Sequence, residues 1–93
     1  MRARRVDANH STIVKTFRQL GFSVADTSRL GNGFPDLVVA KRGRTMVVEV
    51  KDGEKPPSER KLTKGEADFA KAWQGEYRIV ESVDEAIRIA NAW

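Results

Sequence analysis

The sequence contains no cysteine and a single histidine, His10, among its 93 residues. Disulfide frameworks, zinc–thiolate sites and thiol catalysis are therefore excluded. A serine–histidine–aspartate triad could use only His10 as its imidazole. No glycine pattern of a phosphate-binding loop is present, so a nucleotide cofactor is not expected. The apolar runs are shorter than the roughly 18 residues of a membrane helix, and no signal-peptide core is present. We therefore expect a cytoplasmic protein without a membrane partner.

The chain is short and carries more basic than acidic residues. Its length allows one domain, residues 1–93, and because stability is marginal at this size we expect a homodimer. Seventeen basic and thirteen acidic residues give a formal net charge of +4, which favours a nucleic acid as partner over an anionic membrane surface. Residues 1–5 hold three arginines and are predicted to form a flexible basic arm.

Hydrophobic periodicity and turn residues predict the order helix, strand, strand, strand, helix, strand, helix. The first helix has an apolar stripe that includes His10, and two capping-box patterns, Thr63–Glu66 and Ser82–Glu85, mark the starts of later helices. The segment 52–61 is polar and interrupted by proline, which predicts a loop. The predicted ranges are 7–20 (helix), 22–28, 37–41 and 45–51 (strands), 63–74 (helix), 77–80 (strand) and 82–90 (helix).

Two strand-forming runs in the middle of the chain are accompanied by charged residues that a buried sheet should not contain. Leu37–Lys41 and Thr45–Lys51 are rich in valine and apolar on both faces, which predicts central strands covered from two sides. Yet Asp36 lies at the start of the first run, and Glu49 and Lys51 lie within the second. Burying a charge is costly unless it is paired or binds a metal, so these residues indicate a functional site.

The register between these two runs decides whether the charged residues meet. A two-residue turn at 42–43, or a four-residue loop, sets Asp36 opposite Glu49 with Cβ atoms about 4.5–5.5 Å apart. A three-residue loop with a bulge would break this pairing. Lys51 is two residues past Glu49 and projects from the same face. Opposed carboxylates repel each other unless a divalent cation lies between them, and their oxygens suit Mg²⁺ or Mn²⁺.

These residues form a pattern that resembles the PD-(D/E)XK nuclease signature: Pro35-Asp36, twelve further residues, and then Glu49-Val50-Lys51. From Val6 to Ala90 the chain is similar to the virus-type replication-repair nuclease (VRR-NUC) domain, in a stand-alone, phage-like form. The motifs that carry this similarity are Asp7-Ala8-Asn9, Gly31–Asp36, Glu49–Gly53, Pro57-Ser58 with Lys61-Leu62-Thr63, and Val80–Ala86. The resemblance implies an α/β, restriction-endonuclease-like core of order α-β-β-β-α-β-α, with a central mixed sheet flanked by helices.

The resemblance also implies an activity, the divalent-metal-dependent hydrolysis of phosphodiester bonds in DNA, with Mg²⁺ or Mn²⁺ as cofactor. Asp36 and Glu49 are the expected metal ligands, joined by the backbone carbonyl of Val50, and Lys51 would orient the attacking water or stabilise charge. The expected substrate is branched DNA such as a four-way junction, cut by a homodimer in DNA repair in a bacterial or phage-infected cell. The alternative is an inactive nuclease fold that only binds DNA, because His10 stands where relatives usually carry a glutamate.

Other polar residues have two interpretations each. His10 faces inward and is either a metal contact, directly or through water, or a packing residue. Glu66, near a position where the family commonly has glutamine, either supports the site or only caps its helix. The remaining basic residues close to the central strands either follow DNA phosphates or form a solvated surface; they are Arg29, Lys55, Arg60, Lys61 and Lys64.

Overall fold

The computed structural model of the chain describes residues 7–93, and its elements follow the predicted order. The predicted basic arm, residues 1–5, lies outside the described residues. The segment predicted as a loop also contains one short 3₁₀ helix, whose first turn accepts a proline readily. Within residues 7–93 no helix is both long and apolar enough to cross a membrane. The elements are α1 (His10–Gln19), β1 (Ser23–Asp26), β2 (Leu37–Lys41), β3 (Arg44–Val50), η1 (Pro57–Glu59), α2 (Lys64–Ala72), β4 (Glu76–Val80) and α3 (Val83–Asn91).

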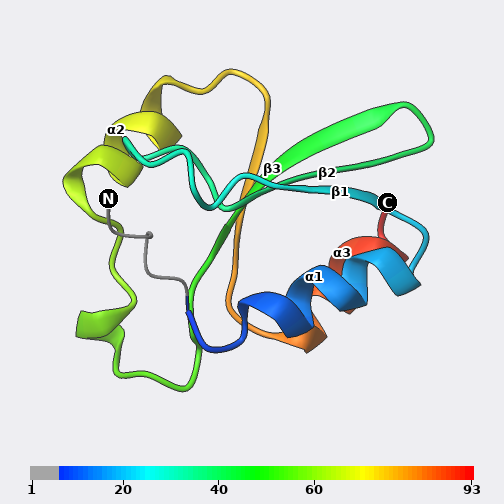
Figure 1. The fold of residues 1–93 in the computed structure, drawn as a ribbon, viewed down its shortest axis with the longest axis horizontal. Helices are drawn as coiled ribbons and strands as arrows, with labels where there is room; N and C mark the ends of the chain where they lie inside the picture. The colour runs from blue at the N-terminus through cyan, green and yellow to red at the C-terminus, as the bar shows by residue number, and fades with distance from the viewer. Residues whose placement is uncertain (1–6) are drawn as a thin grey trace.

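The strands form one mixed sheet in the order β1-β2-β3-β4 (Figure 1). β1, β2 and β3 pair antiparallel, whereas β4 lies parallel to β3 and the chain reaches it through α2. The two valine-rich runs, predicted to be central, are the two inner strands of this sheet. The predicted fold class, a mixed sheet flanked by helices, is therefore confirmed.

β2 and β3 are joined by the two-residue turn that the predicted register requires. Residues 42 and 43 have φ values of 55° and 76°, the left-handed conformation of a type I′ turn, which matches the twist of the flanking strands. Leu37 pairs with Val48 in the resulting ladder. The next position along the two chains therefore sets Asp36 opposite Glu49, and the register prediction is confirmed.

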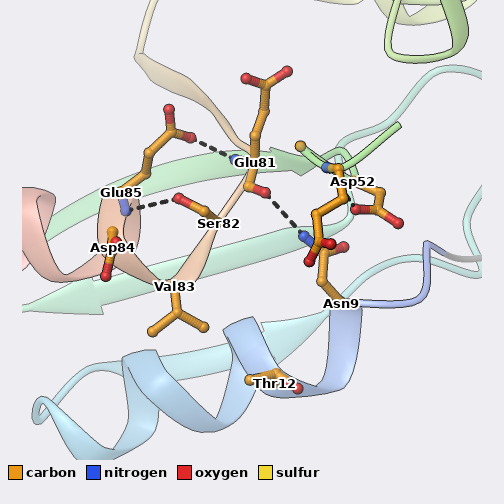
Figure 2. A pocket seen from close by; sticks show the side chains of 10 residues that line it. Asn9, Thr12, Asp52, Glu81, Ser82, Val83, Asp84 and Glu85 are labelled. Carbon is orange, nitrogen blue, oxygen red and sulfur yellow. Dashed lines mark hydrogen bonds between the residues drawn. The ribbon is translucent and has the colours of Figure 1, made fainter. Parts of the chain in front are cut away.

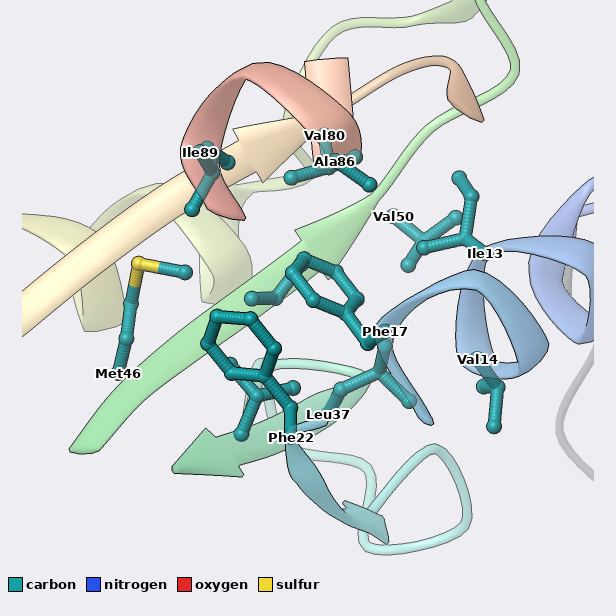
Figure 3. Packing of buried hydrophobic residues seen from close by; sticks show 12 residues of the cluster. Ile13, Val14, Phe17, Phe22, Leu37, Met46, Val50, Val80, Ala86 and Ile89 are labelled. Carbon is teal, nitrogen blue, oxygen red and sulfur yellow. The ribbon is translucent and has the colours of Figure 1, made fainter. Parts of the chain in front are cut away.

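Helices α1 and α3 lie side by side against one face of the sheet, and α2 lies toward the opposite face (Figure 1). The hydrophobic core fills the space between the α1–α3 pair and the sheet (Figure 3). Leu37 and Val48 are fully buried in this core. Because neighbours along a strand point to opposite faces, Asp36 and Glu49 point away from the core, toward the α2 side.

Candidate active site

Asp36 is fixed against β3 by a backbone hydrogen bond. β2 begins only at Leu37, and the Asp36 side chain takes the place of a ladder partner: its Oδ2 accepts a hydrogen bond of 2.9 Å from the backbone amide of Val50. The residue is 5% exposed. One carboxylate of the site is thus anchored to the strand that carries the other charged residues. Whether the Val50 carbonyl binds a metal stays a prediction.

Glu49 is the most buried charged residue of the described chain, at 1% exposed. Its Oε1 is buried and accepts no hydrogen bond from any residue of 7–93. Burial, and next the negative charge of Asp36, raise the pKa of Glu49 to about 9. At neutral pH the folded protein therefore holds this side chain ionised only if positive charge is added beside it.

Lys51 supplies a buried cation on the same face, and a residue of α2 is its main partner. Its Nζ lies 2.9 Å from Glu66 Oε1 and 3.8 Å from Glu49 Oε2. Burial lowers the pKa of Lys51, but the hydrogen bond and charge of Glu66 outweigh it, so the net direction is upward. For Glu66, burial raises the pKa, and the bond to Lys51 outweighs that effect and lowers it. The two groups are therefore an ion pair at neutral pH.

Glu66 reaches this position through the cap of its own helix. The predicted capping box is present: Thr63 Oγ1 accepts from the Glu66 amide at 3.2 Å, and Glu66 Oε1 accepts from the Thr63 amide at 2.9 Å. The same Oε1 atom accepts from Lys51. Of the two interpretations of Glu66, the structure favours the one in which it both caps α2 and supports the site.

A close backbone contact sets the distance between α2 and the sheet. Gly33 has φ +80°, and a Cβ atom on it would lie 2.2 Å from the carbonyl oxygen of Gly65. Only glycine permits such an approach at that φ value. The loop before β2 therefore packs directly on the first turn of α2, which brings Glu66 within reach of Lys51.

His10 is not brought to the carboxylate pair. Its Nε2 lies 3.0 Å from Asp26 Oδ2, and Asp26 also accepts from the amide and hydroxyl of Ser28. Burial raises the pKa of Asp26. The hydrogen bonds from Ser28 and then from His10 outweigh this effect, and the pKa is lowered to about 2. Asp26 pairs with Leu37 and therefore shares the α1 face of the sheet, opposite to Asp36. The predicted contact between His10 and a metal thus has no support from the geometry.

Arg60 and Lys55, two of the predicted DNA contacts, lie in the loop that follows β3 and already have partners in the described chain. The guanidinium of Arg60 donates to the Lys55 carbonyl at 2.7 Å and lies 3.3 Å from a carboxylate oxygen of Glu81. The ammonium of Lys55 lies 3.7 Å from Asp7. Arg60 therefore holds the loop closed toward the end of β4, which is a structural role.

The remaining predicted DNA contacts lie at the surface. Lys64 forms an exposed ion pair with Asp68, one helical turn away, at 2.8 Å. Arg29 and Lys61 are exposed and form no ion pair with any residue from 7 to 93. Lys61 and Arg29 are thus the predicted DNA contacts whose charges the described chain leaves most available to phosphates.

Asn9 joins the start of α1 to the ends of β3 and β4, a role that sequence reasoning missed. Its Nδ2 donates to the backbone carbonyls of Lys51 at 3.0 Å and Glu81 at 3.1 Å, and Figure 2 shows the second of these bonds. The bond to the Lys51 carbonyl fixes the backbone at the residue whose side chain, the Lys51 ammonium, enters the site. Asn9 occurs in a motif of the resemblance, but an asparagine before a helix usually signals only a cap.

A surface cavity of about 570 Å³ beside Asn9 is separate from the carboxylate pair. Figure 2 shows its wall of acidic side chains, which comes from the loop after β3 and the start of α3. Such a surface repels phosphates, so the cavity is not a route for DNA. Its acidic residues are Asp52, Glu54, Glu81, Asp84 and Glu85.

Tyr77 of β4 is a further polar residue of the site face that the sequence did not single out. Its hydroxyl is buried and has no hydrogen-bond partner among residues 7–93. Burial, followed by the negative charges of Glu49, Glu66 and Asp36, raises the pKa of Tyr77 to about 12. A tyrosine in a predicted strand is normally a packing residue, so no sequence signal distinguished it.

The charged residues fit a divalent cation held by few protein ligands. No group of three or more histidine, cysteine, aspartate or glutamate residues in the described chain is arranged to hold a metal. Asp36 and Glu49 nevertheless offer adjacent carboxylates, and Glu49 keeps a buried oxygen that has no donor among residues 7–93. Mg²⁺ is commonly bound by one or two carboxylates, with water and substrate phosphate completing its shell. The donor set therefore suits Mg²⁺ or Mn²⁺ and does not suit a closed zinc site.

Comparison with known proteins agrees with this fold. No protein-family model matches the sequence, and no curated protein matches it. A solved structure described as a VRR_NUC domain matches with a TM-score of 0.62 and 26% sequence identity, over 94% of this chain and 99% of that one. This match and the sheet order confirm the resemblance to the VRR-NUC domain, with its restriction-endonuclease-like fold, that the sequence indicated.

Proposed function

We propose that this domain is a divalent-metal-dependent DNA endonuclease whose active site consists of Asp36, Glu49 and Lys51. The observation that carries the proposal is the pairing of two buried carboxylates on the sheet face that also holds a buried lysine. A bound Mg²⁺ or Mn²⁺ supplies Lewis-acid chemistry, lowering the pKa of water and offsetting charge on the phosphodiester.

The protein groups have separate tasks in this proposal. Asp36, anchored by the Val50 amide, fixes where the cation binds, and Glu49 is held ionised once positive charge lies beside it. Lys51 stabilises the negative charge that develops on the phosphate and orients the attacking water. Lys51 donates a hydrogen bond of 2.9 Å to Glu66 Oε1, and this bond favours the protonated form that both tasks require.

The substrate and assembly are proposed from the family resemblance and from charge. Branched DNA, including four-way junctions, is the proposed substrate, met in the cytoplasm of a bacterial or phage-infected cell during DNA repair. A homodimer would present two sites related by symmetry and cut two strands at equivalent positions, which one protomer cannot do. The net charge of +4 supports association with DNA.

A cleavage panel tests the proposal. Linear, flap and four-way DNA substrates are incubated with wild type and Lys51→Ala in Mg²⁺, Mn²⁺ or EDTA, and sedimentation gives the oligomeric state. We expect cleavage by wild type with either metal, fastest on branched DNA, and none in EDTA or with the variant. A variant that cut as fast as wild type would contradict the assignment. Metal-independent DNA binding without cleavage would instead support the inactive binding module.

A further inference from the structure

Two buried polar atoms without partners lie on the site face of neighbouring strands. They are the Tyr77 hydroxyl and Glu49 Oε1, and neither has a hydrogen-bond partner in the described chain. Tyr77 pairs with Val47 and Glu49 pairs with Ile79, so the two residues are diagonal neighbours on the same face. Neighbouring strands lie about 4.8 Å apart and each residue rises about 3.3 Å, so the two Cα atoms are about 8 Å apart, within reach of an aromatic side chain.

The tyrosine ring has a packing role, but its hydroxyl does not. Phe69 of α2 packs against Tyr77 with ring centroids 6.3 Å apart, and Phe34 and Trp73 extend this aromatic layer. A phenylalanine at position 77 would fill the same space without a polar atom to bury. A buried hydroxyl without a partner is costly, and such groups in folded proteins call for an explanation, often a functional one.

Among residues 7–93, no group donates to Glu49 Oε1 when the carboxylate is ionised. Lys51 is closer to the other oxygen, at 3.8 Å, and is bonded more tightly to Glu66. Asp36 is an acceptor when ionised and offers Glu49 no proton. A phenol carries a proton that it can donate at neutral pH, so Tyr77 is a donor on the same face.

We propose that Tyr77 is a positioning residue for the metal site: its hydroxyl donates a hydrogen bond to Glu49 Oε1 when Glu49 is ionised against a divalent cation. This inference rests on the proposed function. Hydrogen bonds to an ionised acceptor are short and strong, and donors behind a metal ligand fix its orientation. Removing such a donor typically weakens metal binding by about 10–100-fold.

Calorimetric titration of MnCl₂ into wild type, Tyr77→Phe and Phe69→Leu tests this role. Phe69→Leu is the matched control because it alters packing on the same ring and leaves the hydroxyl in place. We expect Tyr77→Phe to weaken Mn²⁺ binding by about 10-fold or more. Its melting temperature in EDTA should equal or exceed that of wild type, because the deleted hydroxyl has no partner among residues 7–93. Phe69→Leu should keep Mn²⁺ affinity while it lowers the melting temperature.

Four results of these titrations and melting measurements would overturn the proposed role of Tyr77. Mn²⁺ affinity of Tyr77→Phe within twofold of wild type would show that the hydroxyl does not support Glu49. A lower metal-free melting temperature for Tyr77→Phe would show that the hydroxyl is already bonded within the protein. An equal loss of affinity in Phe69→Leu would assign the effect to packing. Wild type that binds no Mn²⁺ would sink the proposed function as well, whereas the first three results leave that function standing.

Discussion

Lys51 Nζ lies 2.9 Å from Glu66 Oε1 and 3.8 Å from the nearest oxygen of Glu49, so helix α2 and not the lysine's own strand holds the buried cation of the site. The same Glu66 oxygen closes the capping box of α2. The start of this helix and the charge state of Lys51 are therefore coupled through one carboxylate.

This coupling predicts that Glu66→Ala lowers the cleavage rate by about 10-fold, as loss of a supporting residue does, and stability by about 1 kcal/mol, as loss of a cap does. Glu66→Gln should retain most activity, because its amide oxygen can still accept from both Thr63 and Lys51. Rates on a branched substrate and melting temperatures measure the two effects.

Glu85→Ala is the matched control for that experiment. Glu85 occupies the corresponding position in α3, where its side-chain Oε1 accepts a hydrogen bond from the backbone amide of Glu81, and it lies outside the proposed site. The control should lose similar stability and keep its cleavage rate. Full activity in Glu66→Ala would show that Lys51 does not depend on this partner.

Gly33→Ala should destabilise the protein more than Gly31→Ala. Both glycines have left-handed φ values, which cost an alanine about 1 kcal/mol. Only at Gly33 would the new Cβ also collide with the backbone, adding an overpacking cost of about 1–3 kcal/mol, whereas Gly31 has no atom within 4 Å of that position. Urea denaturation of both variants measures the difference, and equal losses would rule out the close contact with Gly65.

Asp26 should contribute stability at neutral pH that is lost in acid. Its carboxyl pKa is lowered from 3.8 to about 2 in the fold, so the ionised form stabilises the folded state above pH 3.8. The difference in melting temperature between wild type and Asp26→Asn should therefore shrink as the pH falls from 3.8 to about 2. Asp68→Asn, which removes an exposed partner of Lys64, should show little difference at any pH. A constant Asp26→Asn difference would contradict the bonds from Ser28 and His10.

Arg29→Ala and Lys61→Ala should each weaken DNA binding in a salt-dependent way. If each residue contacts one phosphate, the slope of log affinity against log salt should fall by about 1 per variant. Lys15→Ala is the control, because Lys15 is exposed on α1, at the opposite face of the sheet. Fluorescence anisotropy with a labelled duplex measures the slopes. Unchanged slopes for Arg29 and Lys61 would place the DNA elsewhere.

The order of the elements and the position of Asp36 opposite Glu49 could both be predicted from the sequence. Both follow from local rules: valine-rich runs form inner strands, and a two-residue turn with glycine at its second position sets one register. This register was enough to place the charged side chains on one face of the sheet, because side-chain direction alternates strictly along a strand.

The remaining details depend on tertiary distances that no local pattern encodes. His10 has the inward position expected from its helical stripe, but Asp26, sixteen residues away, determines what its ring contacts. The link from Glu66 to Lys51 depends on how closely the Gly33 backbone approaches α2. Asn9 and Tyr77 gave no signal because an asparagine before a helix and a tyrosine in a strand have ordinary structural roles.

The central claim, that Asp36 and Glu49 together hold a divalent cation, is tested most directly by Mn²⁺ electron paramagnetic resonance on wild type, Glu49→Gln and Glu54→Gln. Free Mn²⁺ gives a strong signal that decreases on binding, and Glu54 is an exposed acidic control. We predict that wild type and Glu54→Gln bind Mn²⁺ and release it to EDTA, whereas Glu49→Gln leaves the ion free at the same concentrations. Equal Mn²⁺ binding by Glu49→Gln and wild type would contradict the account.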